Sequence, residues 1–209
     1  MAQFGGVDKV IYLLTSSVSK IGVIILAAGS SSRLGRPKQL LRFNGESLLQ
    51  KSVKAALDVS DITLTVLGAH YQEIGEEIKY LKTKSLFNLD WNKGMGNSIK
   101  FGLHEIHKEH PDLNAVIIMV CDQPFVSGEL LNTMIDAYHR GNALVASSYG
   151  STVGVPALFD RQYFKQILKI DDKKGAKAIL NHGDAYLIPF PQGSQDIDTP
   201  KDWENFKAM

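Results

Sequence analysis

The sequence predicts a single α/β domain of the Rossmann-like type, built on a doubly wound, mostly parallel β-sheet. Three observations favour this fold: short continuous apolar runs, apolar stripes at helical spacing between them, and the alternation of the two along the chain. Continuous apolar runs are typical of strands buried on both faces, and their alternation with amphipathic helices predicts βαβ units. Sheets of this kind bind ligands beyond the carboxyl ends of their strands.

Six apolar segments are expected to be strands: 23–26, 62–67, 85–89, 115–120, 144–147 and 185–188. Four segments between or after them carry apolar residues on one helical face. These stripes are Leu49, Val53, Ala56 and Leu57; Ile99, Leu103 and Ile106; Leu131, Met134, Ile135 and Tyr138; and Phe164, Ile167 and Leu168. No repeat or low-complexity tract divides the chain, so one domain is expected over residues 21–209.

Composition excludes several classes of protein. An apolar fraction of 44% and a charged fraction of 22% are those of a globular chain. A net charge of +1 gives no general attraction to nucleic acid or to a membrane surface. The single cysteine, Cys121, cannot form an internal disulfide, so a cytoplasmic protein is expected. Residues 1–20 are sparsely charged and match no signal peptide, and we interpret them as an extension of unknown role.

A glycine-rich basic loop follows the first expected strand, at the edge where a parallel sheet binds ligands. Gly29 lets the backbone approach a ligand closely, and consecutive backbone N–H groups in such a turn form an anion cradle. Arg33, Arg36 and Lys38 add three cations within six residues. The spacing fits neither a Walker loop nor a dinucleotide fingerprint. The loop is therefore either a binding site for a phosphate chain or a solvated basic loop.

Two acidic positions are candidates for a magnesium site. Asp122 follows the strand expected at 115–120, where its carboxylate could hold Mg²⁺ or stabilise a turn before Gln123-Pro124. Asp196 and Asp198 are two residues apart in an extended stretch, which puts both side chains on one face. Thr199 could equally cap a helix that begins at Pro200.

The segment Gly94-Met95-Gly96-Asn97-Ser98 precedes the helix with the Ile99 stripe. Asn97 or Ser98 could cap that helix. Two flanking glycines exceed what a cap needs, and they favour backbone packing against a base or ribose. Asn92, just upstream, could donate hydrogen bonds to the base.

The loop from Leu26 to Lys38 resembles the L-A-A-G-x-S-x-R-x-G-x-x-K signature of sugar-nucleotide-type nucleotidyltransferases at every fixed position. With Gln39-Leu40-Leu41 next, the chain is most similar to the molybdenum cofactor cytidylyltransferase family. Further matches follow in the family's order at 94–99, 121–124, 154–156 and 196–200. The resemblance spans residues 21–209, which implies that this segment is a nucleotidyltransferase domain.

The resemblance implies an Mg²⁺-dependent transfer of CMP from CTP to the terminal phosphate of a molybdopterin-type acceptor, with release of pyrophosphate. It implies that Lys38, Arg33 and Asp122 are catalytic, and that Asp122 and Asp198 hold the metal, with Asp196 as a supporting neighbour. The implied nucleotide-binding residues are Leu26, Ala27, Ala28, Gly29, Ser31, Arg33, Gly35, Lys38, Asn92, Gly94, Gly96, Asn97 and Ser98. The partners expected are the triphosphate, the acceptor and a docked molybdoenzyme, with neither nucleic acid nor membrane.

Other readings remain open. A guanylyltransferase, or an enzyme for another phosphorylated metabolite, keeps the chemistry and changes the substrates. A non-catalytic carrier of the molybdenum cofactor would need no metal site, so Lys38, Asp122 and Asp198 speak against it. L-A-A-G resembles the cytidylyl branch, and the Ala28 methyl would disfavour a purine if it pointed into the pocket.

Overall fold

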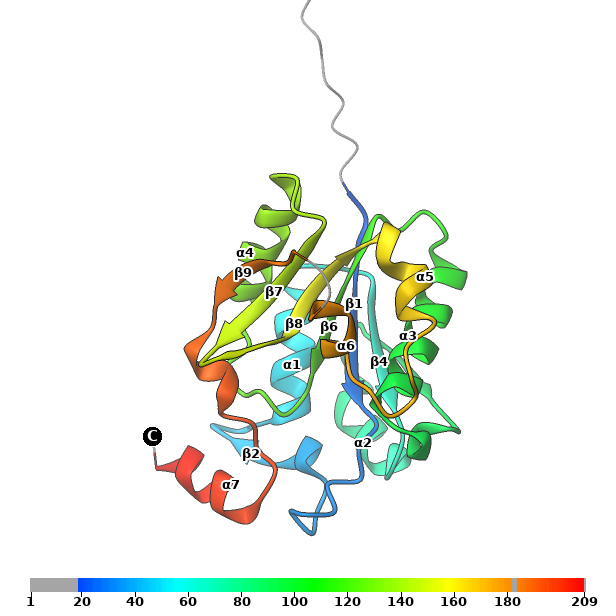
Figure 1. The fold of residues 1–209 in the computed structure, drawn as a ribbon. Coiled ribbons are helices and arrows are strands. Elements are labelled where there is room, and N and C mark those ends of the chain that lie inside the picture. The colour runs from blue at the N-terminus through cyan, green and yellow to red at the C-terminus, as the bar shows by residue number, and fades with distance from the viewer. Residues whose placement is uncertain (1–18, 182–183, 209) are drawn as a thin grey trace, which may run out of the picture.

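The computed structural model describes residues 19–181 and 184–208 of the chain. Residues 1–18 of the extension expected at 1–20 lie outside this range. Within it, one mixed sheet lies between two layers of helices (Figure 1), which is the predicted doubly wound α/β fold.

The sheet has seven strands in the order β5-β4-β1-β6-β8-β7-β9. Their bounds are β1 Ile21–Ala27, β4 Thr63–Leu67, β5 Lys84–Phe87, β6 Ala115–Val120, β7 Leu144–Tyr149, β8 Thr152–Asp160 and β9 Tyr186–Pro189. β1 pairs in parallel with both β4 and β6, and β4 pairs in parallel with β5. The sequence order therefore reverses direction across β1, which brings the carboxyl ends of β1 and β6 side by side.

One strand, β8, was not predicted. It pairs antiparallel with β6 on one side and with β7 on the other. Its sequence includes Gly154 and Pro156, and both residue types are unfavourable within a strand. The strand forms because β6 and β7 pair with it on its two sides. A two-stranded ribbon of β2 (Arg42–Phe43) and β3 (Glu46–Ser47) was not predicted either.

Helices cover both faces of the sheet. One face packs against α1 (Leu48–Leu57), α2 (Tyr71–Ile78) and α4 (Gly128–His139), and the other against α3 (Met95–Glu109), α5 (Phe164–Ile167) and α6 (Lys177–Leu180). Alternate residues of β1 enter the two cores: Val23 and Ile25 enter one, Ile24 and Leu26 the other. This alternation explains the continuous apolar run in the sequence. Among the described residues, no helix is long and apolar enough to cross a membrane.

A third, smaller cluster joins the C-terminal helix α7 (Pro200–Lys207) to the segment after β1. Trp203 and Phe206 of α7 pack with Leu34, Leu41 and Leu48. Figure 1 shows α7 beside β2, far from the strand core. This contact brings the end of the chain back to the glycine-rich loop.

Candidate active site

A cavity of about 320 Å³ opens at the carboxyl ends of β1 and β6. It has the position expected for a ligand site in an open α/β sheet. Nine of the sequence-predicted site residues line it: Leu26, Ala27, Ala28, Gly29, Lys38, Asn92, Gly94, Ser98 and Asp122. Ser30, Gln39, Trp91, Met95, Val120 and Cys121 also line it and were not predicted as site residues.

Gln39 holds the glycine-rich loop in shape. It is fully buried, and its Nε2 donates to the carbonyl oxygens of Ala27 and Gly29, each at 2.9 Å. These bonds fix the two carbonyls on either side of Ala28. The sequence signal that could have found it is a Gln directly after Lys38 within an apolar context, because a buried amide needs partners.

Ser31 and Gly35 shape the rest of the loop and do not line the cavity. The Ser31 Oγ accepts from the backbone N–H of Lys38 at 3.1 Å, and the residue has a φ of 54°. Gly35 has a φ of 76°, in the left-handed region that favours glycine, and its N–H donates to the Ser31 carbonyl. Together they turn the chain so that Lys38 faces back toward β6.

The Lys38 ammonium lies between two carboxylates from distant parts of the chain. Its Nζ is 2.5 Å from Asp122 Oδ2 and 2.9 Å from Asp198 Oδ1. Only 15% of the Lys38 side chain is exposed, so the charge depends on these partners. Burial acts to lower the pKa of Lys38, but the Asp122 and Asp198 carboxylates outweigh it and hold the pKa above its usual value.

Arg33 and Asp196 complete the charged cluster. The Arg33 guanidinium donates to Asp198 Oδ2 at 2.7 Å but remains largely exposed and lies outside the cavity lining. Burial acts to raise the pKa of Asp198, while Lys38 and Arg33 lower it below its usual value. Desolvation, together with the charges of Asp122 and Asp198, raises the pKa of Asp196 to about 6. Asp198 thus pairs with both Lys38 and Arg33, whereas Asp196 pairs with neither.

Asp198 reaches the cluster because its segment is fixed on both sides. The N–H of Ile197 donates to the Asp122 carbonyl at 3.1 Å, and Ile197 is buried in the third cluster. Thr199 caps α7 in a capping box with Asp202, as one sequence reading expected. The capping role and the position of Asp198 beside Lys38 therefore coexist, because they use neighbouring residues.

The acidic residues fit a divalent cation. Asp122 Oδ1 is buried and has no hydrogen-bond partner among the described residues. A buried carboxylate oxygen without a partner is what a hard cation binds. Within residues 19–181 and 184–208, no group of three or more acidic, His or Cys side chains is arranged to hold a metal alone. Two carboxylates plus phosphate oxygens and water are the usual ligands of Mg²⁺.

The glycines of the 94–98 turn also meet a packing requirement. A Cβ on Gly94 would lie 2.4 Å from the Asp172 carbonyl oxygen, and one on Gly96 would lie 2.1 Å from that of Asp171. Both glycines are therefore required by the packing of the loop between α5 and α6 on this turn. Gly94 still lines the cavity, whereas Gly96 and Asn97 do not.

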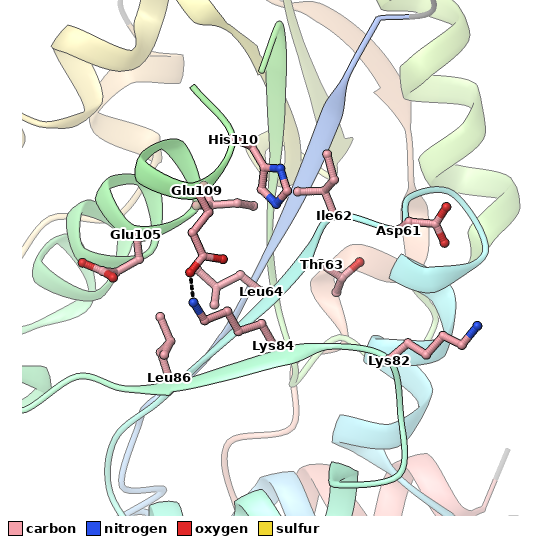
Figure 2. Close-up of a pocket in the computed structure, with 11 residues that line it drawn as sticks. Asp61, Ile62, Thr63, Leu64, Lys82, Lys84, Leu86, Glu105, Glu109 and His110 are labelled. Atoms are coloured by element: carbon pink, nitrogen blue, oxygen red, sulfur yellow. Dashed lines mark hydrogen bonds and ion pairs between the residues drawn. The ribbon is translucent and has the colours of Figure 1, made fainter. Parts of the chain in front are cut away.

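Two further features were compared with the Lys38 cluster: the Cys121 thiol and a second cavity. Burial raises the pKa of the Cys121 thiol to about 12, which excludes a thiolate nucleophile. A second cavity, of about 120 Å³, lies at the opposite edge of the sheet, where Lys84 pairs with Glu109 (Figure 2). It lies beside the amino end of β4, away from the Lys38 cluster.

The chain is similar to proteins of several named activities. It is 29% identical over 131 residues to the nicotine blue oxidoreductase of Paenarthrobacter nicotinovorans, covering 61% of each protein. It is 27% identical to the purine catabolism protein PucB of Bacillus subtilis (87% of this chain, 93% of PucB). It is 25% identical to the molybdenum cofactor cytidylyltransferase of Escherichia coli (89% and 95%). The chain thus spans nearly the whole length of the last two proteins and about three fifths of the first.

Solved structures share the fold. The crystal structure of Rv0371c from Mycobacterium tuberculosis superimposes with a TM-score of 0.78 at 24% identity, covering 91% of this chain and 99% of that one. A complex of Rv0371c with manganese superimposes with a TM-score of 0.73 at 22% identity, with the same coverage. The family described as the MobA-like NTP transferase domain matches residues 23–186. This chain therefore belongs to the MobA-like NTP transferase family and is a nucleotidyltransferase.

Proposed function

We propose that this enzyme transfers CMP from CTP to the terminal phosphate of a molybdopterin-type acceptor, with Mg²⁺ and with release of pyrophosphate. The observation that carries the proposal is the pairing of Lys38 with Asp122 and Asp198 at the edge of the cavity. A buried ammonium and two carboxylates beside a backbone cradle suit phosphoryl chemistry. The similarity to the cytidylyltransferase of E. coli supports the choice of CTP and of the acceptor.

In this proposal the protein positions reactants and neutralises charge. The acceptor phosphate attacks the α-phosphate of the triphosphate, the bond to the β-phosphate breaks, and pyrophosphate leaves. A phosphate monoester is already a nucleophile at neutral pH, so no general base is needed. Lys38 neutralises charge on the α-phosphate, and the backbone from Ala27 to Gly29 and the Arg33 guanidinium hold the phosphate chain.

Asp122 and Asp198 are the residues that would hold Mg²⁺. The metal supplies neutralisation of the phosphate oxygens when bound. The buried Oδ1 of Asp122, which has no partner among the described residues, supports this assignment. The complex of Rv0371c, a protein of the same fold, with manganese supports it as well. Asp196 stays a supporting neighbour, because neither Lys38 nor Arg33 bonds to it.

The bulk of Ala28 does not support the choice of base. Ala28 is only 6% exposed, and a Cβ on Gly68 would lie 2.7 Å from its methyl carbon. The methyl group therefore packs against the end of β4. The preference for CTP over GTP rests on the L-A-A-G resemblance and on the similarity to the cytidylyltransferase of E. coli.

Pyrophosphate release tests this function. The purified protein is incubated with Mg²⁺, each of the four ribonucleoside triphosphates and a panel of acceptors that includes molybdopterin cofactor. We expect release only with the molybdopterin-type acceptor, and a preference for CTP over GTP of at least about tenfold in kcat/KM, or ~1.4 kcal/mol. Equal or greater incorporation of GTP would make the enzyme a guanylyltransferase. Release with a different phosphorylated metabolite would reassign the acceptor, and a protein that binds the cofactor without release would be a carrier.

A further inference from the structure

Asn88 directly follows β5, carries a buried side-chain amide, and was not predicted from the sequence to be a site residue. The residue is 3% exposed. Its Nδ2 donates to Asn97 Oδ1 at 3.0 Å and to Ser98 Oγ at 3.2 Å. One side chain thus contacts both polar residues of the turn that begins α3.

The orientation of the Asn88 amide is fixed by a backbone donor. The N–H of Asp90 donates to Asn88 Oδ1 at 3.1 Å, and a backbone N–H can only donate. The oxygen of the amide must therefore face Asp90, and the NH₂ group must face the turn. Both protons of that NH₂ group are then used, one for each residue of the turn.

Asn97 is oriented in the same way from the other side. Its Nδ2 lies 3.3 Å from Asp172 Oδ1, and its backbone N–H donates to the Asp172 carbonyl at 3.2 Å. The Lys100 ammonium, 2.6 Å from Asp172 Oδ1, lowers the pKa of Asp172, which keeps the carboxylate an acceptor. Asn97 therefore connects Asn88 to the loop that packs on Gly94 and Gly96, and its amide faces the protein.

Ser98 has a different role, because its hydroxyl accepts from Asn88. A hydroxyl that accepts through a lone pair keeps its single proton to donate. Within the described parts of the chain, no acceptor for that proton is found. Ser98 is buried and lines the cavity with Leu26, Lys38 and Asp122. Its hydroxyl proton is thus available to a molecule bound there.

We propose that Asn88 is a positioning residue that makes Ser98 a hydrogen-bond donor to the bound nucleotide. The ligand group is an acceptor atom of the nucleoside part, such as a ring nitrogen or a carbonyl oxygen of a pyrimidine. Asn88 does not touch the nucleotide and acts through Ser98. Asn97, which the resemblance implied to be nucleotide-binding, does not line the cavity and links the turn to Asp172. The inference rests on the proposed nucleotide function of the cavity.

A double-mutant cycle on Asn88 and Ser98 tests this. The variants are Asn88→Asp, Asn88→Leu, Ser98→Ala and the two double combinations, and the measurement is the Kd for CTP with Mg²⁺ and no acceptor, by calorimetry. Asn88→Asp keeps the shape but accepts from Ser98, which withdraws the proton from the cavity. Asn88→Leu has a similar shape without charge, so it separates this effect from repulsion between a new carboxylate and the triphosphate.

We expect each single variant to raise the Kd about tenfold, and each double variant to stay within about twofold of Ser98→Ala. In turnover assays KM for CTP should rise while kcat changes little. Asn142→Asp is the matched control. Asn142 donates to the Ala137 carbonyl at 2.8 Å, beyond the end of α4, so this change should cost stability without altering the Kd.

Two outcomes would overturn the proposal. Additive effects, near a hundredfold in the double variants, would mean that Asn88 acts independently of Ser98. An unchanged Kd in Ser98→Ala, which removes one atom and should fold, would overturn it even if both Asn88 variants failed to fold. A wild-type protein that binds none of the four triphosphates would contradict the proposed function itself, whereas normal CTP binding with additive variants would contradict only the role of Asn88.

Discussion

Lys38 Nζ lies 2.5 Å from Asp122 Oδ2, although 84 residues separate them in the sequence. The same ammonium lies 2.9 Å from Asp198 Oδ1, near the other end of the chain. Three segments thus meet at one charged group: the loop after β1, the end of β6, and the residue before the cap of α7.

Lys38→Ala should fold normally and lose turnover. The lysine is the buried cation beside the phosphate cradle, and removing one stabiliser of a charged transition state costs on the order of 10²–10³ in kcat. Steady-state kinetics with the substrates identified by the pyrophosphate assay measure this, with circular dichroism as the check on folding. Wild-type turnover in a folded variant would remove Lys38 from the mechanism.

Lys38→Met should strengthen the binding of metal in the absence of nucleotide. The ammonium occupies the space between the two carboxylates, so a cation has to compete with it for the same oxygens. We expect the Kd for Mn²⁺ to fall about tenfold, ~1.4 kcal/mol, in titrations followed by electron paramagnetic resonance. Lys54→Met controls for the loss of one positive charge, because Lys54 lies on α1 in an exposed ion pair with Glu46 of β3. Weaker or equal Mn²⁺ binding in Lys38→Met would show that the ammonium does not compete.

Amide substitutions should rank the three acids. Asp122→Asn and Asp198→Asn should each weaken Mn²⁺ binding and nearly abolish turnover, because the amide keeps the size and removes the charge a hard cation requires. Asp196→Asn should weaken Mn²⁺ binding and lower turnover less than Asp198→Asn does. The same Mn²⁺ titration and kinetic assay provide both readouts. If Asp196→Asn proves the more damaging of the two, the assignment within the Asp196–Asp198 pair is wrong.

Asp196 should also make stability depend on pH. Its pKa is about 6 in the folded protein against 3.8 ordinarily, so between these values the folded state holds a proton that the unfolded chain has lost. The stability contributed by this group therefore falls as pH rises from about 4 to about 6. Asp196→Asn should have a higher Tm than wild type at pH 7.5 in EDTA, with the gain vanishing at pH 4. A gain of equal size at both pH values would assign it to a cause other than ionisation.

Gln39→Leu should loosen the phosphate cradle. The substitution leaves the carbonyls of Ala27 and Gly29 without their Nε2 donor, at a cost of about 1–3 kcal/mol per unsatisfied group. Urea denaturation should show the lost stability, and KM for the triphosphate should rise because the turn is no longer held. Gln72→Leu, on the exposed start of α2, provides a matched control. Unchanged stability in Gln39→Leu would mean that the loop is held by other contacts.

The local pattern of the sequence was enough for much of the fold. The strand predicted at 115–120 has the same bounds as β6. The bounds of the strands predicted at 23–26 and 62–67 differ from those of β1 and β4 by at most two residues. The stripes at Leu49, Ile99 and Leu131 all lie on helices that pack on the sheet. These predictions succeeded because burial of one or both faces of an element requires apolar residues at a regular spacing, which is visible in the sequence.

The same pattern missed elements whose stability comes from distant partners. β8 includes a glycine and a proline, and its ladder exists because β6 and β7 flank it. Asn88 and Gln39 are polar residues whose roles follow from buried amide groups that bond to neighbouring segments, 9 to 12 residues away along the chain. Nothing in their immediate neighbours indicates those partners.

The sequence by itself determined the doubly wound sheet, the edge that carries the site, and the identity of its charged residues. It nominated Lys38 and Asp122 from the strands that they follow, and Asp198 from the resemblance to the family. Only the tertiary structure decided that Lys38 lies between the two carboxylates, that Gly94 and Gly96 are required by the loop between α5 and α6, and that Asn97 faces Asp172. Periodicity records which side of an element is buried, whereas hydrogen bonds and ion pairs depend on where the other elements pack.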